Sequence, residues 1–236
     1  MEALLEKSMP LLLDASSGVR SQLERMLQAL PTRDISDNVS KALPYIRAAM
    51  THLSQDIRRS ALDVLSWLLS SAGNDLVSCP GGWTKTLECC AMLLNWKNLT
   101  PQNAWNSSKT SFRTDSKAIA RAMQVIEQLL SVGLVAGTAS SGTDENPEER
   151  DLPLYHSQYH RIPTKSNAYS YLHLFGMPTD DDSQMLEDPE ERLLVFNHRF
   201  RPSFILGIEG AKREGGDLGR VAGQLSKTIN TASIDD

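Results

Sequence analysis

The chain repeats itself at a spacing of 38 residues, and this repeat constrains the fold more than any other feature. When the sequence is shifted by 38 positions, residues 10–20 fall on residues 48–58. Each copy ends in an aliphatic residue followed by arginine, and an apolar stripe follows: Leu23, Met26, Leu27 and Leu30 in the first copy, and Ala61, Val64, Leu65 and Leu68 in the second. Self-similarity at this period is typical of proteins that stack one supersecondary unit on the next.

Each copy predicts a pair of helices. Spacings of three and four residues put each stripe on one face of a helix. The stretch before each stripe has the same spacing: Leu4, Leu5, Met9 and Leu12, then Ala42, Leu43, Ile46 and Met50. Polar turns at residues 14–18 and 54–56 join the two helices of a pair, and we expect their side chains to cap the incoming helix. Neither pair could bury both faces alone, so we expect the pairs to stack as a solenoid.

A more divergent third pair follows Gly81-Gly82, with helices expected over residues 83–94 and 116–132. The loop between them, residues 95–115, contains Trp96, Trp105 and Phe112. A loop of this length is uncommon inside a compact repeat. Its aromatic residues indicate that it folds back onto the solenoid or onto a partner.

The pattern changes after the third pair, and we divide the chain into repeats (1–132), a flexible acidic linker (133–150) and a C-terminal arm (151–236). Residues 151–187 have no sustained period and predict extended chain with short turns. Helices are expected to begin at Asp188-Pro189, with an interruption at Pro202, and then at Ser203 and Asp217.

A proline in the first helix, an aspartate at the turn and Val/Ile-Arg opening the second helix resemble the HEAT repeat. In that family the aspartate and arginine form a ladder between neighbouring repeats. The resemblance implies this role for Asp14, Arg20 and Arg58, although His52 stands where the second copy should have aspartate. The predicted fold class is all-α, a HEAT-like helical-repeat solenoid of about three pairs with an irregular C-terminal arm.

Met1 lies on a helical stripe with no cap before it, so we expect the latter part of a longer protein, or one shortened at its N-terminus.

Charge and hydropathy argue against two classes of protein: nucleic-acid binders without sequence preference and membrane-spanning proteins. Residues 1–131 carry 14 Lys and Arg against 12 Asp and Glu, whereas residues 132–236 carry 10 against 17. Affinity for nucleic acid without sequence preference needs cations that displace phosphate counterions, so this acidic chain is a poor candidate for it. Its apolar stretches are broken well before the roughly 20 residues that a membrane span needs, which predicts no membrane segment.

Candidate chemical groups favour a structural interpretation, and we predict no enzyme activity, cofactor or metal. Cys79, Cys89 and Cys90 are too few for a disulfide framework, and adjacent cysteines on a helix point about 100° apart, which does not suit zinc. The pair His156 and His160 has helical metal spacing but lies among prolines. The acidic stretch 180–191 is compatible with a docking surface for a basic partner or with a solvated loop.

Residues 45–58, 61–69 and 81–87, together with residues 10–31, resemble the Ipi pre-rRNA-processing family, known in animals as testis-expressed protein 10. The resemblance implies a subunit of the nuclear Rix complex, located in the nucleoplasm or nucleolus. It also implies four partners: the Rix scaffold subunit, a WD-repeat propeller subunit, the midasin AAA ATPase and the pre-60S particle. The implied role is processing of the second internal transcribed spacer. The family usually begins with a lysine-rich tail, which these residues lack, so direct RNA contact has no support here.

Aromatic residues in irregular segments are the candidate partner contacts, because such side chains often anchor protein interfaces. They are Trp96, Trp105, Tyr155, Tyr159, Tyr169, Tyr171, Phe196 and Phe200. One alternative is a general HEAT adaptor that binds peptide motifs in transport or signalling. Another, a hydrolase within residues 151–200, would depend on His156, His160 and His173.

Overall fold

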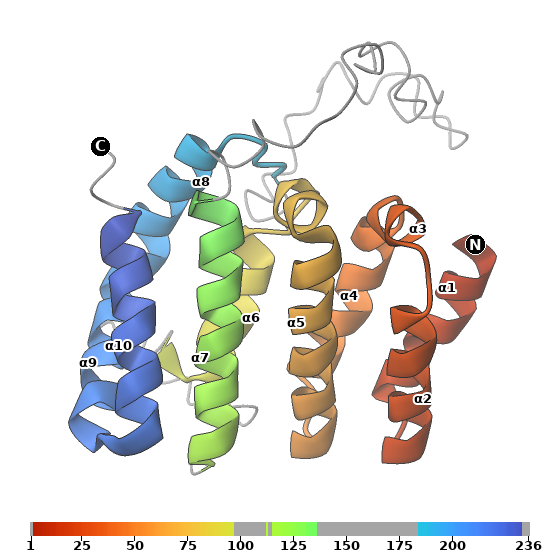
Figure 1. Ribbon diagram of the computed structural model, residues 1–236, viewed down its shortest axis with the longest axis horizontal. Helices are drawn as coiled ribbons and strands as arrows, with labels where there is room; N and C mark the ends of the chain where they lie inside the picture. The colour runs from red at the N-terminus through yellow and green to blue at the C-terminus, as the bar shows by residue number, and fades with distance from the viewer. Residues whose placement is uncertain (1, 97–111, 113–114, 136–183, 233–236) are drawn as a thin grey trace, which may run out of the picture. The chain divides into compact units, whose positions relative to one another are not determined.

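The computed structural model describes residues 2–96, 112, 115–135 and 184–232, and Figure 1 shows how their helices are arranged. All of these residues belong to one unit, made of residues 1–137 and 182–236. Over these ranges the backbone forms helices and turns and contains no strand. The predicted all-α class is therefore confirmed.

The helices of this unit lie in two layers (Figure 1). The first layer places four helices side by side, each in contact with the next: α2 (Ser17–Gln28), α5 (Gln55–Ser78), α7 (Ser116–Leu130) and α10 (Gly216–Thr231). Behind it lie α4 (Val39–Met50), α6 (Thr84–Leu93) and α9 (Arg201–Glu214). Helix α4 packs on α5, α6 on α7, and α9 on α10, so helices that follow one another along the chain form pairs.

The first two pairs follow the predicted apolar stripes. The chain starts with α1 (Glu2–Ser8) and the 3-10 segment η1 (Met9–Leu13), which packs against α2 and α4. Leu23 and Leu27 of α2 are buried, as are all four predicted stripe residues of α5. A short helix that the sequence did not predict, α3 (Thr32–Ser36), packs against α5. The helical spacing thus identified most of the buried positions. The exceptions are Met26, Leu30 and Ala42, which are only partly buried, and Leu4, which is 46% exposed.

Helix α5 extends well beyond its predicted stripe. It bends at Ala72, whose φ of −143° and ψ of 43° are not helical. Just after the bend it approaches η4 (Ser131–Val135), a π-helical turn that continues α7. The end of α5 and the end of α7 therefore meet at one place, where the C-terminal helices also attach.

A fourth pair is built from the end of the chain. Its first part runs without a break through α8 (Pro189–Val195), the π-helical turn η9 (Phe196–Phe200) and α9. The expected interruption at Pro202 does not occur, because Pro202 lies in the first turn of α9, where a missing N–H leaves no helical bond unmade. Helix α8 contacts η4 and α10 contacts α7, so the described C-terminal residues pack on the third pair. The limits of the predicted linker and arm stay a prediction, since residues 136–183 lie outside the described ranges.

Candidate interaction surface

Three buried arginines, Arg20, Arg58 and Arg192, occupy one position, four residues after the N-cap of their helix. They are 4%, 5% and 5% exposed. Each guanidinium turns back beneath its helix and donates two hydrogen bonds from Nη1 to the carbonyl oxygens five and six residues earlier. The arginine thus fixes the turn that leads into the helix.

Arg20 joins its own turn to the neighbouring pair. Its Nη1 donates to the carbonyl oxygens of Asp14 and Ala15 at 2.6 and 3.1 Å. Its Nε donates to Oγ of Ser60, on α5, at 3.0 Å. A single side chain therefore sets the turn before α2 and its alignment with α5.

Arg58 repeats the two contacts to its own turn one pair later. Its Nη1 donates to the carbonyl oxygens of His52 and Leu53 at 2.7 and 2.8 Å. Its guanidinium lies 5.1 Å from the centroid of the Phe112 ring, a cation–π contact. Burial lowers the pKa of Arg58, and the charge of Arg59 lowers it further.

Arg192 does the same for the fourth pair, and the sequence reasoning missed it. Its Nη1 donates to the carbonyl oxygens of Leu186 and Glu187, both at 2.8 Å, and its Nε donates to that of Gly133 in η4 at 2.8 Å. Burial lowers its pKa, an effect that Asp188 opposes. A signal for this residue existed, because Asp188 precedes Arg192 by the same four positions that separate Ser54 from Arg58.

The expected capping by turn side chains is wrong for α2 and α5. Neither Ser16 nor Ser54 makes a side-chain cap bond. Instead Asp14 Oδ1 accepts from the backbone N–H of Ser16 at 2.7 Å, and His52 Nδ1 accepts from that of Ser54 at 3.0 Å. Asp14 and His52 therefore shape equivalent turns, which explains how histidine can replace aspartate in the second copy.

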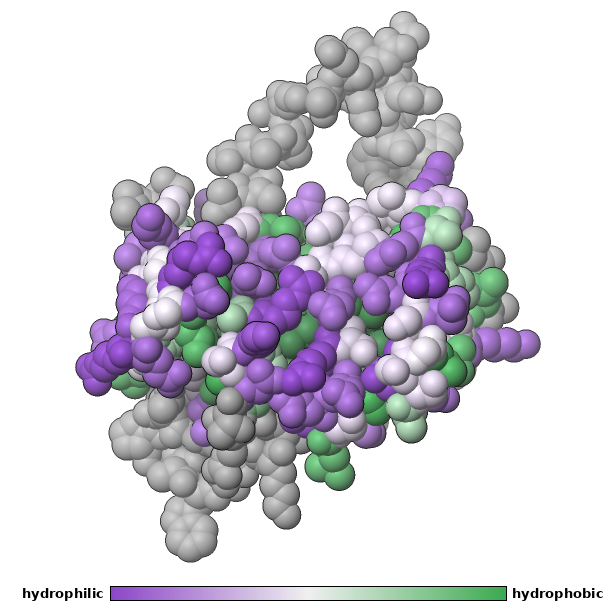
Figure 2. All heavy atoms as spheres, turned by 60° about the horizontal axis from the view of Figure 1, so that its bottom comes forward, coloured by the Kyte–Doolittle hydropathy of each residue, from purple (hydrophilic) through white to green (hydrophobic). Residues whose placement is uncertain are grey.

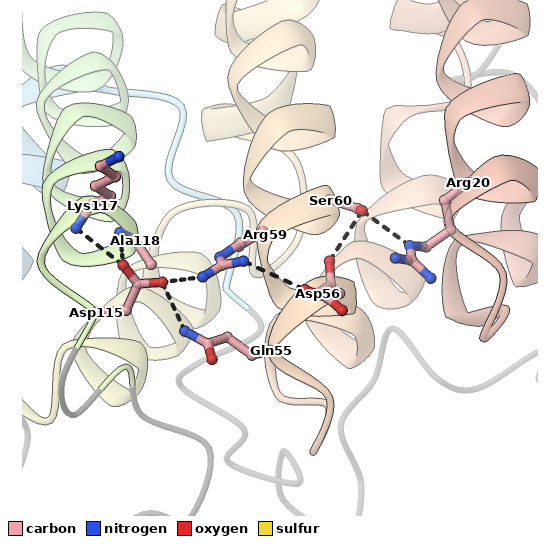
Figure 3. Close-up of polar contacts among 8 residues, drawn as sticks. All are labelled: Arg20, Gln55, Asp56, Arg59, Ser60, Asp115, Lys117 and Ala118. Atoms are coloured by element: carbon pink, nitrogen blue, oxygen red, sulfur yellow. Dashed lines mark hydrogen bonds and ion pairs between the residues drawn. The ribbon is translucent and has the colours of Figure 1, made fainter.

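Polar contacts between the pairs differ from the implied ladder. The Asp14 carboxylate bonds within its own turn and Arg20 reaches a serine, whereas the inter-pair ion pairs join α5 to α7 (Figure 3). Arg59 contacts the Asp115 carboxylate, and the Arg59 hydrogen bond is the main reason why the pKa of Asp115 is lowered. Asp115 also caps α7 by accepting from two backbone N–H groups at 3.2 Å.

Two further polar contacts join α5 to α7. Arg121 Nη2 lies 2.9 Å from Asp63 Oδ1, and the Ser66 hydroxyl donates to Gln128 Oε1 at 2.7 Å. Exposed ion pairs of this kind each stabilise a fold by only about 0–1 kcal/mol. Their main effect is on alignment, because each contact restricts how far α5 and α7 can slide past each other.

Trp96, Phe196 and Phe200, three of the predicted partner contacts, meet in the interior. Their ring centroids lie 5.1, 5.6 and 6.2 Å from that of Phe204, all edge to face, and all three side chains are buried. Gly207 lies against the Trp96 indole, with no room for a Cβ atom. In this structure the three side chains therefore contact residues of their own chain, and a role in partner binding stays a prediction. The other predicted contacts, Trp105, Tyr155, Tyr159, Tyr169 and Tyr171, lie outside the described residues.

Large apolar side chains are exposed at few places in the described ranges. They are Leu4, Leu11, Leu53, Met185, Leu194, Ile205 and Leu206. Two lie at the first pair, one on a turn and four between residues 185 and 206. The face that carries the N-terminal ends of α2, α5 and α7 is mostly hydrophilic, with small separate apolar spots (Figure 2).

The described residues offer little for catalysis or metal binding. Burial raises the pKa of the Cys79 thiol to about 11 and that of Cys90 further, so both are protonated at neutral pH. Over the described ranges no three His, Cys, Asp or Glu side chains gather as a metal site would require. The three candidate histidines of the hydrolase hypothesis lie outside these ranges. No described helix combines the length and apolar character of a membrane span.

Comparison with known proteins finds relatives of one family. A family model described as "Rix1 complex component involved in 60S ribosome maturation" matches residues 33–130. The pre-rRNA-processing protein ipi1 of Sclerotinia sclerotiorum is 42% identical over 241 residues, covering 98% of this chain and 68% of the relative. The protein of the same name from Neosartorya fischeri is 41% identical, covering 98% and 70%. That from Chaetomium thermophilum is 36% identical, covering 99% and 69%.

Proposed function

Because this chain belongs to the Ipi1 family of Rix1 complex components, which act in 60S ribosome maturation and pre-rRNA processing, we propose that it is a noncatalytic scaffold subunit. The observation that carries this proposal is that its buried arginines bind backbone carbonyl groups. Arg20, Arg58 and Arg192 all hold backbone carbonyl groups of their own turns. Such groups build a rigid frame rather than a reactive centre.

The frame is, in our proposal, a short HEAT-type solenoid. Three features support it: the 38-residue repeat, the layered pairs of helices, and the recurrence of a buried arginine four residues after the N-cap of three helices. In a solenoid each pair contacts mainly its neighbours, which leaves long faces free for partners. The helix pairs then display these faces at a fixed spacing.

We place the subunit in the nucleus, within an assembly that contains the Rix scaffold subunit, a WD-repeat propeller subunit and midasin, bound to the pre-60S particle. There it would support processing of the second internal transcribed spacer. Family membership favours this role over a general HEAT adaptor in transport or signalling. The net charge of −5 favours attachment through proteins rather than through RNA.

Affinity purification tests this proposal. The tagged chain is isolated from nuclear extract, its partners are identified by mass spectrometry, and its RNA is probed for spacer-containing precursors. We expect the Rix scaffold, the propeller subunit, midasin and pre-60S proteins, with accumulation of spacer precursors when the chain is depleted. A preparation free of ribosome-assembly factors would refute the scaffold role.

A second arm of the experiment locates the binding region. A variant with residues 138–181 replaced by a short Gly/Ser linker keeps all four helix pairs, because these residues lie outside the described unit. If the candidate tyrosines at 155, 159, 169 and 171 bind partners, this variant should fold normally and co-purify less of the Rix scaffold. Unchanged recovery would remove these tyrosines from the interface.

A further inference from the structure

The outer face of α8 exposes a leucine in acidic surroundings. Leu194 is 68% exposed, and among the large apolar side chains of the described ranges only Leu53, on a turn, is more exposed at 76%. Glu190 and Glu191 precede Leu194 by four and three residues, so they lie beside it on the same face of the helix. Leu194, Glu190 and Glu191 form what we name the Leu194 surface.

The other side of α8 is buried against the rest of the chain. Arg192 and Phe196, two residues on either side of Leu194, point inward and are 5% and 1% exposed. Packing inside the chain therefore accounts for one face of α8 and leaves Leu194 without an apolar neighbour to cover it. An exposed leucine is ordinary by itself, but here the charge around it is also one-sided.

Four exposed carboxylates lie within five residues at the start of α8: Glu187, Asp188, Glu190 and Glu191. Within the described part of the chain, none of them forms an ion pair. The nearest cation in sequence, Arg192, points inward to three backbone carbonyl groups. The first basic side chains on the outside, His198 and Arg199, come a full turn after Leu194.

Helix α10 is the last described helix of the row that begins with α2. Helix α2 is covered by α5, α5 by α7, and α7 by α10, and these inter-pair interfaces bury the apolar stripes. The last pair has no described helix on its outer side, and α8, which leads into it, exposes Leu194. In stacked repeats the terminal pair needs either a polar outer face or a partner.

We infer that the Leu194 surface binds a basic amphipathic helix of another protein in the complex, with an apolar side chain over Leu194 and Lys or Arg opposite Glu190 and Glu191. This inference rests on the proposed scaffold function and names the chemistry of one partner. A nucleic acid does not fit, because its phosphates would face the carboxylates. The carboxylates all precede Leu194 in the chain, so the basic part of the bound helix must lie toward residue 187.

Photo-crosslinking from position 194 tests the inference in the assembled complex. Benzoylphenylalanine replaces Leu194 in the tagged full chain, the complex is purified and irradiated, and the attached peptide is sequenced by mass spectrometry. We expect a segment of another subunit with lysines or arginines at helical spacing around apolar residues. Attachment to an acidic segment, to RNA, to a second copy of the chain or to its own residues 136–183 would overturn the inference, as would the absence of any adduct.

Matched variants separate this surface from the scaffold role. Leu194→Asp, and Glu190→Lys combined with Glu191→Lys, should each reduce recovery of the crosslinked subunit at least about tenfold, because a buried anchor or its charges are lost. Leu53→Asp, which changes an even more exposed leucine on a distant turn, is the control and should leave recovery unchanged. Circular dichroism should match the wild type in all three.

The two proposals fail differently. If the wild-type chain recovers no Rix subunits, the scaffold function itself is refuted. If the wild type recovers them and both Leu194-surface variants recover them equally well, only the inference about the Leu194 surface is refuted.

Discussion

Replacing Arg192 with alanine should loosen the fourth helix pair. The guanidinium donates three hydrogen bonds of 2.8 Å, to the carbonyl oxygens of Gly133, Leu186 and Glu187, and the side chain is 5% exposed. Alanine leaves these acceptors without their donor. At about 1 kcal/mol net for each bond, the loss in the free energy of unfolding is about 3 kcal/mol. For a domain of this size that lowers Tm by roughly 6–12 °C.

Urea unfolding followed by circular dichroism measures this loss, and hydrogen exchange locates it. Because Arg192 joins η4 to α8, protection should fall in α8, α9, α10 and the end of α7, and stay unchanged in α2 and α4. Arg192→Lys should lie between wild type and alanine, since an ammonium group cannot match the forked geometry of guanidinium. Arg213→Ala, an exposed arginine on α9, is the control and should change stability by less than about 0.5 kcal/mol.

The reasoning would be refuted if Arg192→Ala unfolded within about 0.5 kcal/mol of the wild type, because buried carbonyl groups without donors carry a penalty. It would also be refuted if protection fell equally in every helix. That result would make Arg192 a general stability residue and not the attachment point of the fourth pair.

Changes at three residues and one segment replacement test separate parts of the structure. His52→Ala should lower the free energy of unfolding by about 1 kcal/mol, because the Ser54 N–H loses its acceptor, whereas His52→Asp should be nearly neutral because Asp14 makes the same bond in the first pair; urea titration compares them. Gly207→Ala should destabilise by about 1–3 kcal/mol, because its methyl group meets the Trp96 indole, and near-ultraviolet circular dichroism should report the displaced ring. Asp115→Asn should be less stable than the wild type at pH 7. This difference in the free energy of unfolding should disappear as pH falls below about 4, because the lowered pKa of Asp115 in the folded state gives stability that is lost when the carboxylate is protonated. Unfolding of both proteins at pH 7 and pH 3 measures the change. Replacement of residues 138–181 by a short linker should leave Tm unchanged, because Arg192 holds together Gly133 and Leu186, which are described residues on either side of the segment.

The sequence alone determined the class of fold and most of the helices. Residues at spacings of three and four must share a face, so the stripes of α2, α4, α5 and α7 could be identified without coordinates. The start of α8 followed from Asp188-Pro189 for an equally local reason, because proline is tolerated in the first turn of a helix. The family resemblance also came from local stretches, and the comparisons confirmed it.

The tertiary structure alone decided where the C-terminal helices lie and what the polar residues do. The packing of α10 on α7 joins residues about a hundred positions apart, and no local pattern encodes that distance. The burial of Trp96, Phe196 and Phe200 around Phe204 is of the same kind, since an aromatic residue in a loop has no period that reveals its neighbours. The arginines show both contributions. Their position at each helix start can be seen in the sequence, but the acceptors of Arg20 Nε and Arg192 Nε belong to other pairs. Only the packing of the pairs brings these acceptors within hydrogen-bond distance.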